Sequence, residues 1–528
     1  MSGHSHRRQF LKRVSQGTLL ASLGPALAVD LGLTSPAFAA ESAEAAALNF
    51  GDMESLVCLM QETPVERLQS TVVQKLSEGT SLKTLVAAAA LANARTFGGE
   101  DYIGFHTFMA MSPALSMSSM MPKGQEALPV LKVLYRNTNR IQEFGGRASE
   151  ALQQLAVARS ETATPTQLHD AIRAKEMEKA EQLLASMTAT DARSALEALL
   201  PAVQDNPEVH RTVLPYRAWD MQKIVGTEHA LTLLRQSLHY CVKAEPHRRA
   251  EWDEHGKMLT SLIDEYHLNA KSAGTRTADD AFFNELSTVF AAGTPEDAAK
   301  AAANALAEGF DPAVIGEAIS HAASRLVLVD GGRLPQWEDR LKPAGSVHGD
   351  SVGVHASDSA NAWRNMARVC QGQSQFACLM IGAWQIARDR SYPGNLLKEP
   401  LPAKHHVDRV AGSTAEELLT QMDSAVTNNM QGQATAIAHR FGQLKLPADA
   451  LFSCLLKYAV SEDGALHAEK YFQTVRDAFT RFTDSLSWTD IFSPGDVWRR
   501  AQAIFTPLIA RVTGFVGGLI TQAITWLK

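Results

Sequence analysis

The residues best suited to chemistry lie in one stretch, residues 345–364, which reads GSVHGDSVGVHASDSANAWR. His348 and His355 are seven residues apart, and the two glycines between them would let the loop fold back. Asp350 lies between the histidines and could supply a carboxylate. Two imidazoles and one carboxylate are the minimum set for a metal ion with open coordination positions. We therefore predict His355 and Asp350 as catalytic residues, and His348 and His355 as ligands of a transition metal.

A helix is expected to follow this stretch, beginning near Ser357, with Ser357 or Asp358 as its N-cap. His355 would then lie at a helix N-terminus, where the helix dipole favours the neutral imidazole, the form that binds metals or acts as a base. In the alternative interpretation these residues only cap the helix and hydrogen-bond the loop backbone. This alternative stays open because no established ligand spacing such as His-Glu-x-x-His is present. The sequence leaves both interpretations open.

Two further histidines follow segments that resemble one another. Residues 91–99 (LANARTFGG) and 321–332 (HAASRLVLVDGG) share an alanine-rich helical pattern, an arginine, an apolar step and a Gly-Gly pair. His106 follows the first segment, and the histidines of the chemical stretch follow the second. A weaker third copy spans residues 451–475 and contains His467. The spacing varies, which excludes a fixed-period repeat and leaves duplicated helical hairpins or chance similarity. We predict that His106 and His467 complete the metal site from other helices.

Residues 349–353 also satisfy the Gly-x-Ser-x-Gly pattern of hydrolases, with Ser351 as the nucleophile. That motif requires a strand before the serine and a helix after it, on a parallel sheet. The sequence predicts no such strand framework, so the match is attributed to chance.

The elements that must position these residues have helical periodicity from Ala40 onward. Ser81 precedes one apolar stripe as its cap, and Asp311-Pro312 marks the start of another helix. The best strand candidate, residues 326–329, is short and continuous with that second helix. The pattern therefore predicts an all-α, multi-helical fold.

Composition shifts divide the predicted body into two loosely related helical halves. The first spans residues 40–270 and the second spans residues 280–485, with a linker between them. A tail, residues 486–528, ends in an amphipathic helix over residues 505–528. Its uncharged run is short for a bilayer span, so we expect it to lie on the body, on a partner or on a membrane surface.

The N-terminal 39 residues have the features of an export signal. Residues 6–12, HRRQFLK, resemble the twin-arginine signal, and an apolar run follows them. Ala37-Phe38-Ala39 fits the small-x-small cleavage rule and would leave Ala40 as the mature N-terminus. An ordinary N-terminal helix is the alternative. The resemblance implies that the twin-arginine machinery exports the folded protein, often with a cofactor already bound, to the periplasm or the extracellular space.

The formal net charge is −7, and no polybasic run follows the N-terminal segment, so nucleic acid is not an expected partner. The five cysteines are scattered, without a Cys-x-x-Cys pair, and do not indicate a disulfide scaffold.

The alanine-rich helices with histidine-bearing turns, above all residues 348–364 and His467-Ala468-Glu469-Lys470, resemble questin oxidase-like proteins. Members of that family are helical and are linked to Baeyer–Villiger-type oxidation of aromatic substrates. We predict a protein with a His-lined polar pocket and, if it is an enzyme, a metal- or cofactor-dependent oxidoreductase. No Gly-x-Gly-x-x-Gly fingerprint follows a strand here, so the resemblance does not identify a redox partner. The alternative from another class is a helical binding or envelope-associated protein without catalysis, in which the C-terminal tail is the working part.

Overall fold

The computed structural model describes seven stretches of the chain: residues 47–155, 163–328, 335–337, 352–390, 402–428, 430–461 and 465–484. The chain divides into a unit that ends at Asn49 and a unit that begins at Phe50, and every helix that the structure describes belongs to the second unit. Within the described stretches the regular elements are about 21 α-helices and short 3-10 turns, with no strand. The all-α prediction is therefore confirmed.

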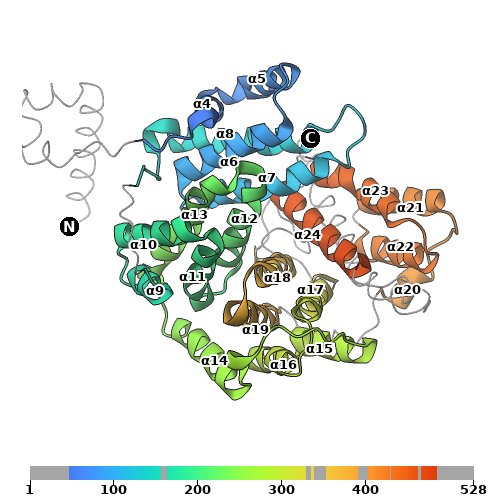
Figure 1. Cartoon of the computed structure of the whole chain (residues 1–528). Coiled ribbons are helices and arrows are strands. Elements are labelled where there is room, and N and C mark those ends of the chain that lie inside the picture. The colour runs from blue at the N-terminus through green and yellow to red at the C-terminus, as the bar shows by residue number, and fades with distance from the viewer. Residues whose placement is uncertain are drawn as a thin grey trace, which may run out of the picture. The chain divides into compact units, whose positions relative to one another are not determined.

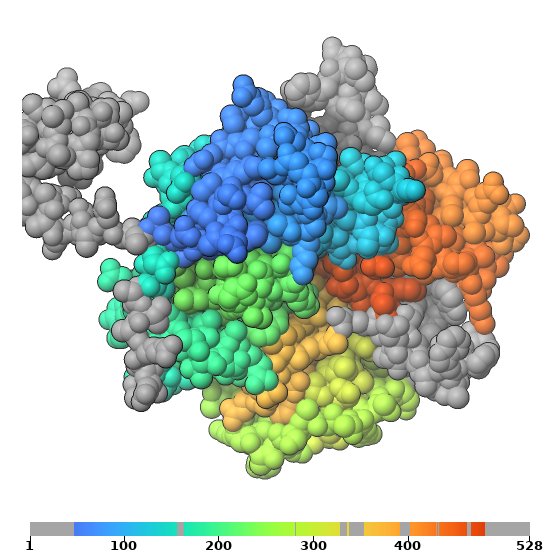
Figure 2. Space-filling view, turned by 45° about the horizontal axis from the view of Figure 1, so that its top comes forward, coloured from blue at the N-terminus to red at the C-terminus, as the bar shows by residue number. Residues whose placement is uncertain are grey.

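The helices of this unit follow the chain in four consecutive groups (Figure 1). The first group comprises α4 (Glu54–Glu62), α5 (Val65–Ser77), α6 (Leu82–Phe97), α7 (Tyr102–Ser118) and α8 (Leu128–Phe144). The second comprises α9 (Pro165–Arg173), α10 (Met177–Thr190), α11 (Ala192–Asp205), α12 (Val209–Val225) and α13 (Ala230–Ala244). The third comprises α14 (Trp252–Glu265), α15 (Asp280–Ala292), α16 (Pro295–Ala307), α17 (Pro312–Leu328), α18 (Val352–Val369) and α19 (Gly372–Arg388). The fourth comprises α20 (Lys404–Val407), α21 (Ala415–Thr427), α22 (Gln431–Gln443), α23 (Ala448–Val460) and α24 (Ala465–Asp484). In the space-filling view the groups occupy separate regions of the surface (Figure 2).

Two predicted helix starts are confirmed by their caps. The Ser81 hydroxyl accepts a hydrogen bond from the backbone N–H of Thr84 at 3.0 Å, and α6 begins at the next residue. The Asp311 carboxylate accepts from the N–H of Ala313 at 2.8 Å, and α17 begins at Pro312. In both cases a side-chain oxygen satisfies a backbone donor that has no partner inside the helix.

The strand candidate at residues 326–329 is wrong. The helix α17 continues through Leu328, and both Leu326 and Val327 are fully buried. Because one helical face continues past the point where the apolar run begins, the run belongs to a buried helix turn and not to a strand.

One helix from each group contributes to a closed ring. The helix α7 packs against α12, α12 against α18, α18 against α24, and α24 against α7. Figure 1 shows these four helices meeting where the groups adjoin. The residues of α7 are buried on nearly every side from Gly104 to Ala114, as expected for a helix enclosed by others. The four helices of this ring therefore lie at the centre of the hydrophobic core of the unit.

Each ring helix also packs against the helix that precedes it in the chain. The pairs are α6 with α7, α11 with α12, α17 with α18, and α23 with α24. The two similar segments noted in the sequence fall at the ends of α6 and α17, the first members of two such pairs.

Within the described stretches, no helix is both long enough and apolar enough to cross a membrane. The predicted export signal, the amphipathic tail at residues 505–528, and the residues His348, Asp350 and Ser351 lie outside the described residues.

Candidate functional site

Four histidines, one from each ring helix, lie together, and we call them the histidine cluster: His106 of α7, His210 of α12, His355 of α18 and His467 of α24. The ring centroid of His106 is 5.0 Å from that of His210 and 5.0 Å from that of His467. The ring of His355 lies 5.8 Å from that of His210. His106 is buried, and the other three are partly exposed. The ring of helices thus brings together side chains that are far apart in sequence.

All four histidines lie within the first two turns of their helices, so four helix N-termini converge on the cluster. Two of these ends are fixed by acidic caps. Asp101 accepts from the N–H of Gly104 at 2.7 Å at the start of α7. Glu208 accepts from the N–H groups of His210 and Arg211, at 3.0 and 2.5 Å, at the start of α12. A helix N-terminus carries partial positive charge, which favours neutral imidazoles over imidazolium ions.

Two of the histidine rings are oriented by hydrogen bonds from Nδ1. The Nδ1 of His106 lies 2.6 Å from the carbonyl oxygen of Tyr102. Because a carbonyl can only accept, this nitrogen carries the proton and Nε2 keeps its lone pair. That Nε2 is buried and has no hydrogen-bond partner. The Nδ1 of His210 lies 3.2 Å from Oε2 of Glu208. Metal-binding histidines typically donate their second ring nitrogen to a carbonyl or a carboxylate in this way.

The charge states of the cluster follow from its surroundings. Burial, with the positive charge of Lys470 and interactions with the other histidines, lowers the pKa of His106 to about 2, so its imidazole stays neutral. Burial raises the pKa of Glu208, but hydrogen bonds from His210 and from backbone N–H groups outweigh burial and bring that pKa to about 2. The hydroxyl of Tyr240 donates to Glu208 at 2.9 Å. The cluster therefore combines a neutral imidazole with an ionised carboxylate.

Aromatic rings form one wall of the cluster. The ring of Tyr102 lies 4.5 Å from that of His106, and the ring of Phe105 lies 4.9 Å from His106 and 5.0 Å from His210. Tyr240 packs edge-on against Phe105 at 5.6 Å. The side of Tyr102 away from the cluster is open, since 60% of this residue is exposed. The cluster therefore lies beneath an aromatic surface residue.

Buried ion pairs lie about one turn further along α18 and α24. Nζ of Lys470, on α24, lies 3.7 Å from the carboxylate of Asp358, on α18. Oδ1 of that carboxylate is buried and accepts no hydrogen bond. Lys132 of α8 forms a second buried pair with Glu469 at 2.7 Å. These pairs place both charge signs beside the imidazoles.

The predicted helix start near Ser357 is wrong. The helix α18 begins at Val352, so Ser357 and Asp358 lie in its second turn, where both are buried and neither is an N-cap. Val354 is fully buried, and this apolar contact extends the helix back toward the glycines. His355 lies in the first turn, as its predicted place at a helix N-terminus requires.

Side-chain geometry sets a clear condition on metal binding. Within the described stretches, no group of three or more His, Cys, Asp or Glu side chains is placed so that it could hold a metal ion. With metal–nitrogen distances of about 2.0–2.1 Å, two imidazoles on one tetrahedral ion have ring centroids roughly 5 Å apart. The three ring separations given above, 5.0, 5.0 and 5.8 Å, are near this value.

Of the predicted ligands, the structure brings together His106, His355 and His467. His348 and Asp350 lie outside the described residues. The sequence analysis missed His210, although Glu208 two residues earlier is an acidic N-cap directly before a helical run. An acid at a helix start followed within two turns by histidine, as in α7 and α12, is the signal that could have found it.

No protein-family model, curated protein or solved structure matches this chain.

Proposed function

We propose that the protein is an exported oxidoreductase that depends on a transition-metal ion bound at the histidine cluster. The observation that carries this proposal is the convergence of His106, His210, His355 and His467 from four separate helices. A buried polar group that is not satisfied lowers stability, and His106, the buried member of the cluster, faces this cost. The buried Nε2 of His106, which has no hydrogen-bond partner, supports a ligand.

Imidazole nitrogens suit copper, iron, nickel and zinc, whereas the oxygen-rich sites that magnesium and calcium prefer are of a different kind. When bound, a redox-active ion such as copper or iron would supply the electron exchange that no side chain of the cluster can provide. The carbonyl of Tyr102 and the carboxylate of Glu208 would hold the rings of His106 and His210 in place.

Nearby charges act in both directions on a bound cation. Lys470 and the helix N-termini oppose it, whereas the ionised carboxylate of Glu208 favours it. The pairing of Lys470 with Asp358 reduces the repulsion. Since neutral imidazoles do not have to lose a proton to bind a metal, binding at neutral pH involves little competition from protons.

The aromatic wall supports an organic substrate with apolar or aromatic surface. Tyr102 and Phe105 present ring faces and edges beside the imidazoles, and such rings favour edge-to-face or offset contacts with aromatic partners. This is consistent with the resemblance to questin oxidase-like proteins. Export by the twin-arginine route is part of the proposal, because that route carries proteins already folded around a cofactor. The non-catalytic alternative depends on the C-terminal tail, which lies outside the described residues.

Elemental analysis of the purified full-length protein tests this proposal. We expect close to one equivalent of a transition metal in protein from its own export pathway, or after reconstitution with copper, iron or zinc. The double variant His106→Gln/His355→Gln should lose the metal and keep the wild-type circular dichroism spectrum. The matched control is His255→Gln, because His255 is buried in α14 outside the cluster and hydrogen-bonds the carbonyl of Asp205. It should keep the metal.

Two results would overturn the proposal. One is wild-type protein that holds no metal above the buffer level after reconstitution with each of the three ions. The other is a double variant that retains the wild-type metal content. For the redox part, the metal-loaded protein should be reduced and reoxidised reversibly, with a spectroscopic signal that the double variant lacks. A bound ion that shows no redox change would restrict the role to metal binding and refute the oxidoreductase assignment.

A further inference from the structure

A second polar site lies further along the ring helices, around a buried arginine. Arg364, in the middle of α18, is only 3% exposed. Its guanidinium donates to the hydroxyl oxygen of Ser320 at 3.1 Å and to the side-chain oxygen of Asn361 at 2.9 Å. Its Nε–H has no hydrogen-bond partner, and no described carboxylate lies within ion-pair distance of it. A fully buried cation is thus solvated by two neutral groups only.

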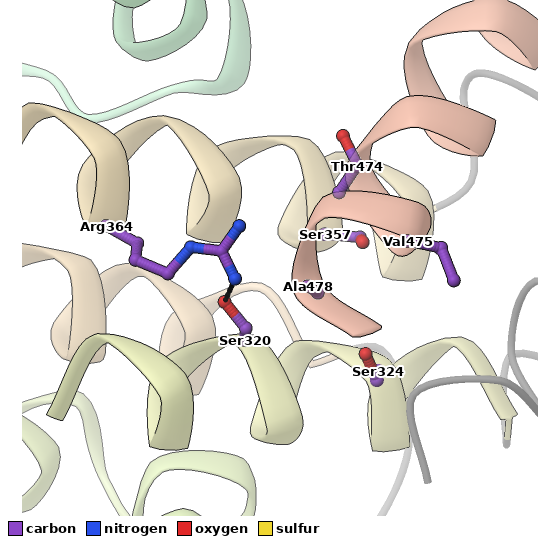
Figure 3. A pocket seen from close by; sticks show the side chains of 7 residues that line it. All are labelled: Ser320, Ser324, Ser357, Arg364, Thr474, Val475 and Ala478. Carbon is purple, nitrogen blue, oxygen red and sulfur yellow. Dashed lines mark hydrogen bonds between the residues drawn. The ribbon is translucent and has the colours of Figure 1, made fainter. Parts of the chain in front are cut away.

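This guanidinium borders a small cavity between α17, α18 and α24. The lining residues are Ser320, Ser324, Ser357, Arg364, Thr474, Val475 and Ala478. Figure 3 shows hydroxyl groups from all three helices around the same space as the arginine. The cavity volume is about 10 Å³, close to what one water molecule requires.

The cavity is lined by hydrogen-bond donors that are not used elsewhere. The hydroxyl of Thr474 is buried and has no partner, and the buried side chains of Ser324 and Ser357 form no hydrogen bond within the described stretches. Ser320 is different, because it donates to the carbonyl of Gly316 at 3.1 Å and so presents only its oxygen to Arg364. One N–H and three O–H groups thus surround a space the size of a single atom or water.

The nearest acidic side chains compensate the charge of Arg364 only weakly. Asp477 and Glu317 act on it at a distance and do not hydrogen-bond it. Burial raises the pKa of Asp477 above its ordinary value despite the nearby Arg364 and Arg217, which makes Asp477 easier to neutralise. An uncompensated buried charge is strongly destabilising, and a water molecule would satisfy hydrogen bonds without supplying the missing negative charge.

We propose that this cavity binds a small monovalent anion of the halide class, chloride under ordinary conditions. The guanidinium of Arg364 supplies the positive charge, and the hydroxyls of Ser324, Ser357 and Thr474 donate to the anion. The volume excludes phosphate, sulfate and carboxylates, which have several heavy atoms. The site is independent of the proposed metal centre, because it shares none of the histidines.

A second, open pocket lies beside Arg364. Arg364 also lines an open pocket on the surface, together with Ala367, Arg368, Gln375 and the start of α17. Arg368 is exposed and places positive charge at this opening, while Asp311, which caps α17, lies on the other side. In the proposal, the positive charge of Arg368 attracts anions to this opening beside Arg364.

Anomalous scattering from bromide tests the proposal directly, with the full-length protein. Crystals grown without halide and soaked in sodium bromide should show an anomalous peak inside the cavity, within hydrogen-bond distance of Arg364. In solution, the thermal midpoint should rise with chloride or bromide and reach a plateau, relative to sodium gluconate at the same ionic strength. Gluconate is too large to enter, so the difference isolates the site.

Variants separate this site from general salt effects. Arg364→Met should abolish the chloride-specific rise, whereas Arg368→Met, one turn away on the same helix, should retain it. If Arg364→Met does not fold, Ser357→Ala/Thr474→Val removes two donors without removing the charge and should weaken the apparent chloride affinity at least several-fold. The absence of a bromide peak in the cavity would overturn the proposal. The proposal would also be overturned if chloride raised the thermal midpoint of the wild-type protein by no more than that of either cavity variant.

Discussion

A buried histidine outside the cluster makes the protein sensitive to mild acid, and the effect can be calculated. His321 of α17 is 7% exposed, and its Nδ1 lies 2.6 Å from the hydroxyl of Ser287. Burial, with a smaller contribution from the positive charge of Arg325, lowers the pKa of His321 to about 3. The ordinary histidine pKa, expected in the unfolded chain, is about 6.5.

The sign follows from proton binding. Between pH 3 and pH 6.5 the unfolded chain takes up a proton on His321 and the folded protein does not. The free energy of unfolding therefore rises with pH in this window, by about 1.4 kcal/mol per pH unit. Going from pH 7.5 to pH 5 should destabilise the folded state by about 2 kcal/mol through this one residue. Ordinary carboxyl pKa values are about 4, in the lower part of this window, so the slopes are compared between pH 5 and pH 6.5.

Other histidines also contribute to the total slope, so the test uses a difference. Burial lowers the pKa of His239, but its hydrogen bonds to Glu100 and Glu181 outweigh burial and raise that pKa, which gives a slope of opposite sign. In His321→Asn the amide takes the place of Nδ1 beside Ser287 and does not titrate. The variant should lose about 1–2 kcal/mol at pH 7.5 through lost packing. Below pH 6.5 the free energy of unfolding of the variant should nevertheless fall less steeply with decreasing pH than that of wild type. The difference between the two slopes should be about 1.4 kcal/mol per pH unit.

Urea unfolding at several pH values between 5 and 8 measures these slopes. The control is His405→Asn, because His405 is exposed on α20 and its replacement should leave the wild-type slope unchanged. Equal slopes for wild type and His321→Asn would refute the calculation. A titration of His321 near pH 6.5 in the folded protein, observed by NMR, would refute it as well.

Two buried or capping carboxylates give further predictions. Asp205 is 2% exposed and hydrogen-bonds His169, Arg173 and Arg248, so Asp205→Asn should lower the free energy of unfolding by about 3 kcal/mol at pH 7. Burial raises the pKa of Asp205, but these partners outweigh burial and lower it. The difference from wild type in urea unfolding should therefore shrink only below about pH 4, where the unfolded chain takes up a proton on Asp205 and the folded protein does not. Asp101→Ala removes the α7 cap and should cost about 1–2 kcal/mol in the same assay, whereas Asp101→Asn, which keeps a capping oxygen, should cost less.

The fold class could be predicted from the sequence because local signals agree with one another along most of the chain. Ser81 and Asp311 cap helices where the apolar periodicity begins, and the structure confirms both starts. The errors occurred where tertiary contacts outweigh local preference. Ser357 and Asp358 are good caps by residue type, but the buried Val354 contact begins α18 earlier. Local propensity alone contains no information about that contact.

The candidate site was only partly predictable for a different reason. The sequence suggested His106, His355 and His467 because each follows a glycine or another polar turn residue. It could not show that α12 lies between α7 and α18, and this packing is what brings His210 into the cluster. The ring of four helices is formed by contacts between distant segments. No spacing in the sequence specifies those contacts.

The position of the cluster at helix N-termini explains how buried imidazoles are tolerated there. For His106 an imidazolium would be opposed both by burial and by the positive helix end, so this ring is held in its neutral form. A neutral ring has one N–H to satisfy, and the first turn of a helix offers a nearby acceptor: the carbonyl of Tyr102 for His106, and the capping carboxylate of Glu208 for His210. The second nitrogen keeps its lone pair. The start of α7 both neutralises and orients His106, and this leaves the Nε2 of that ring available for a cation or a proton donor.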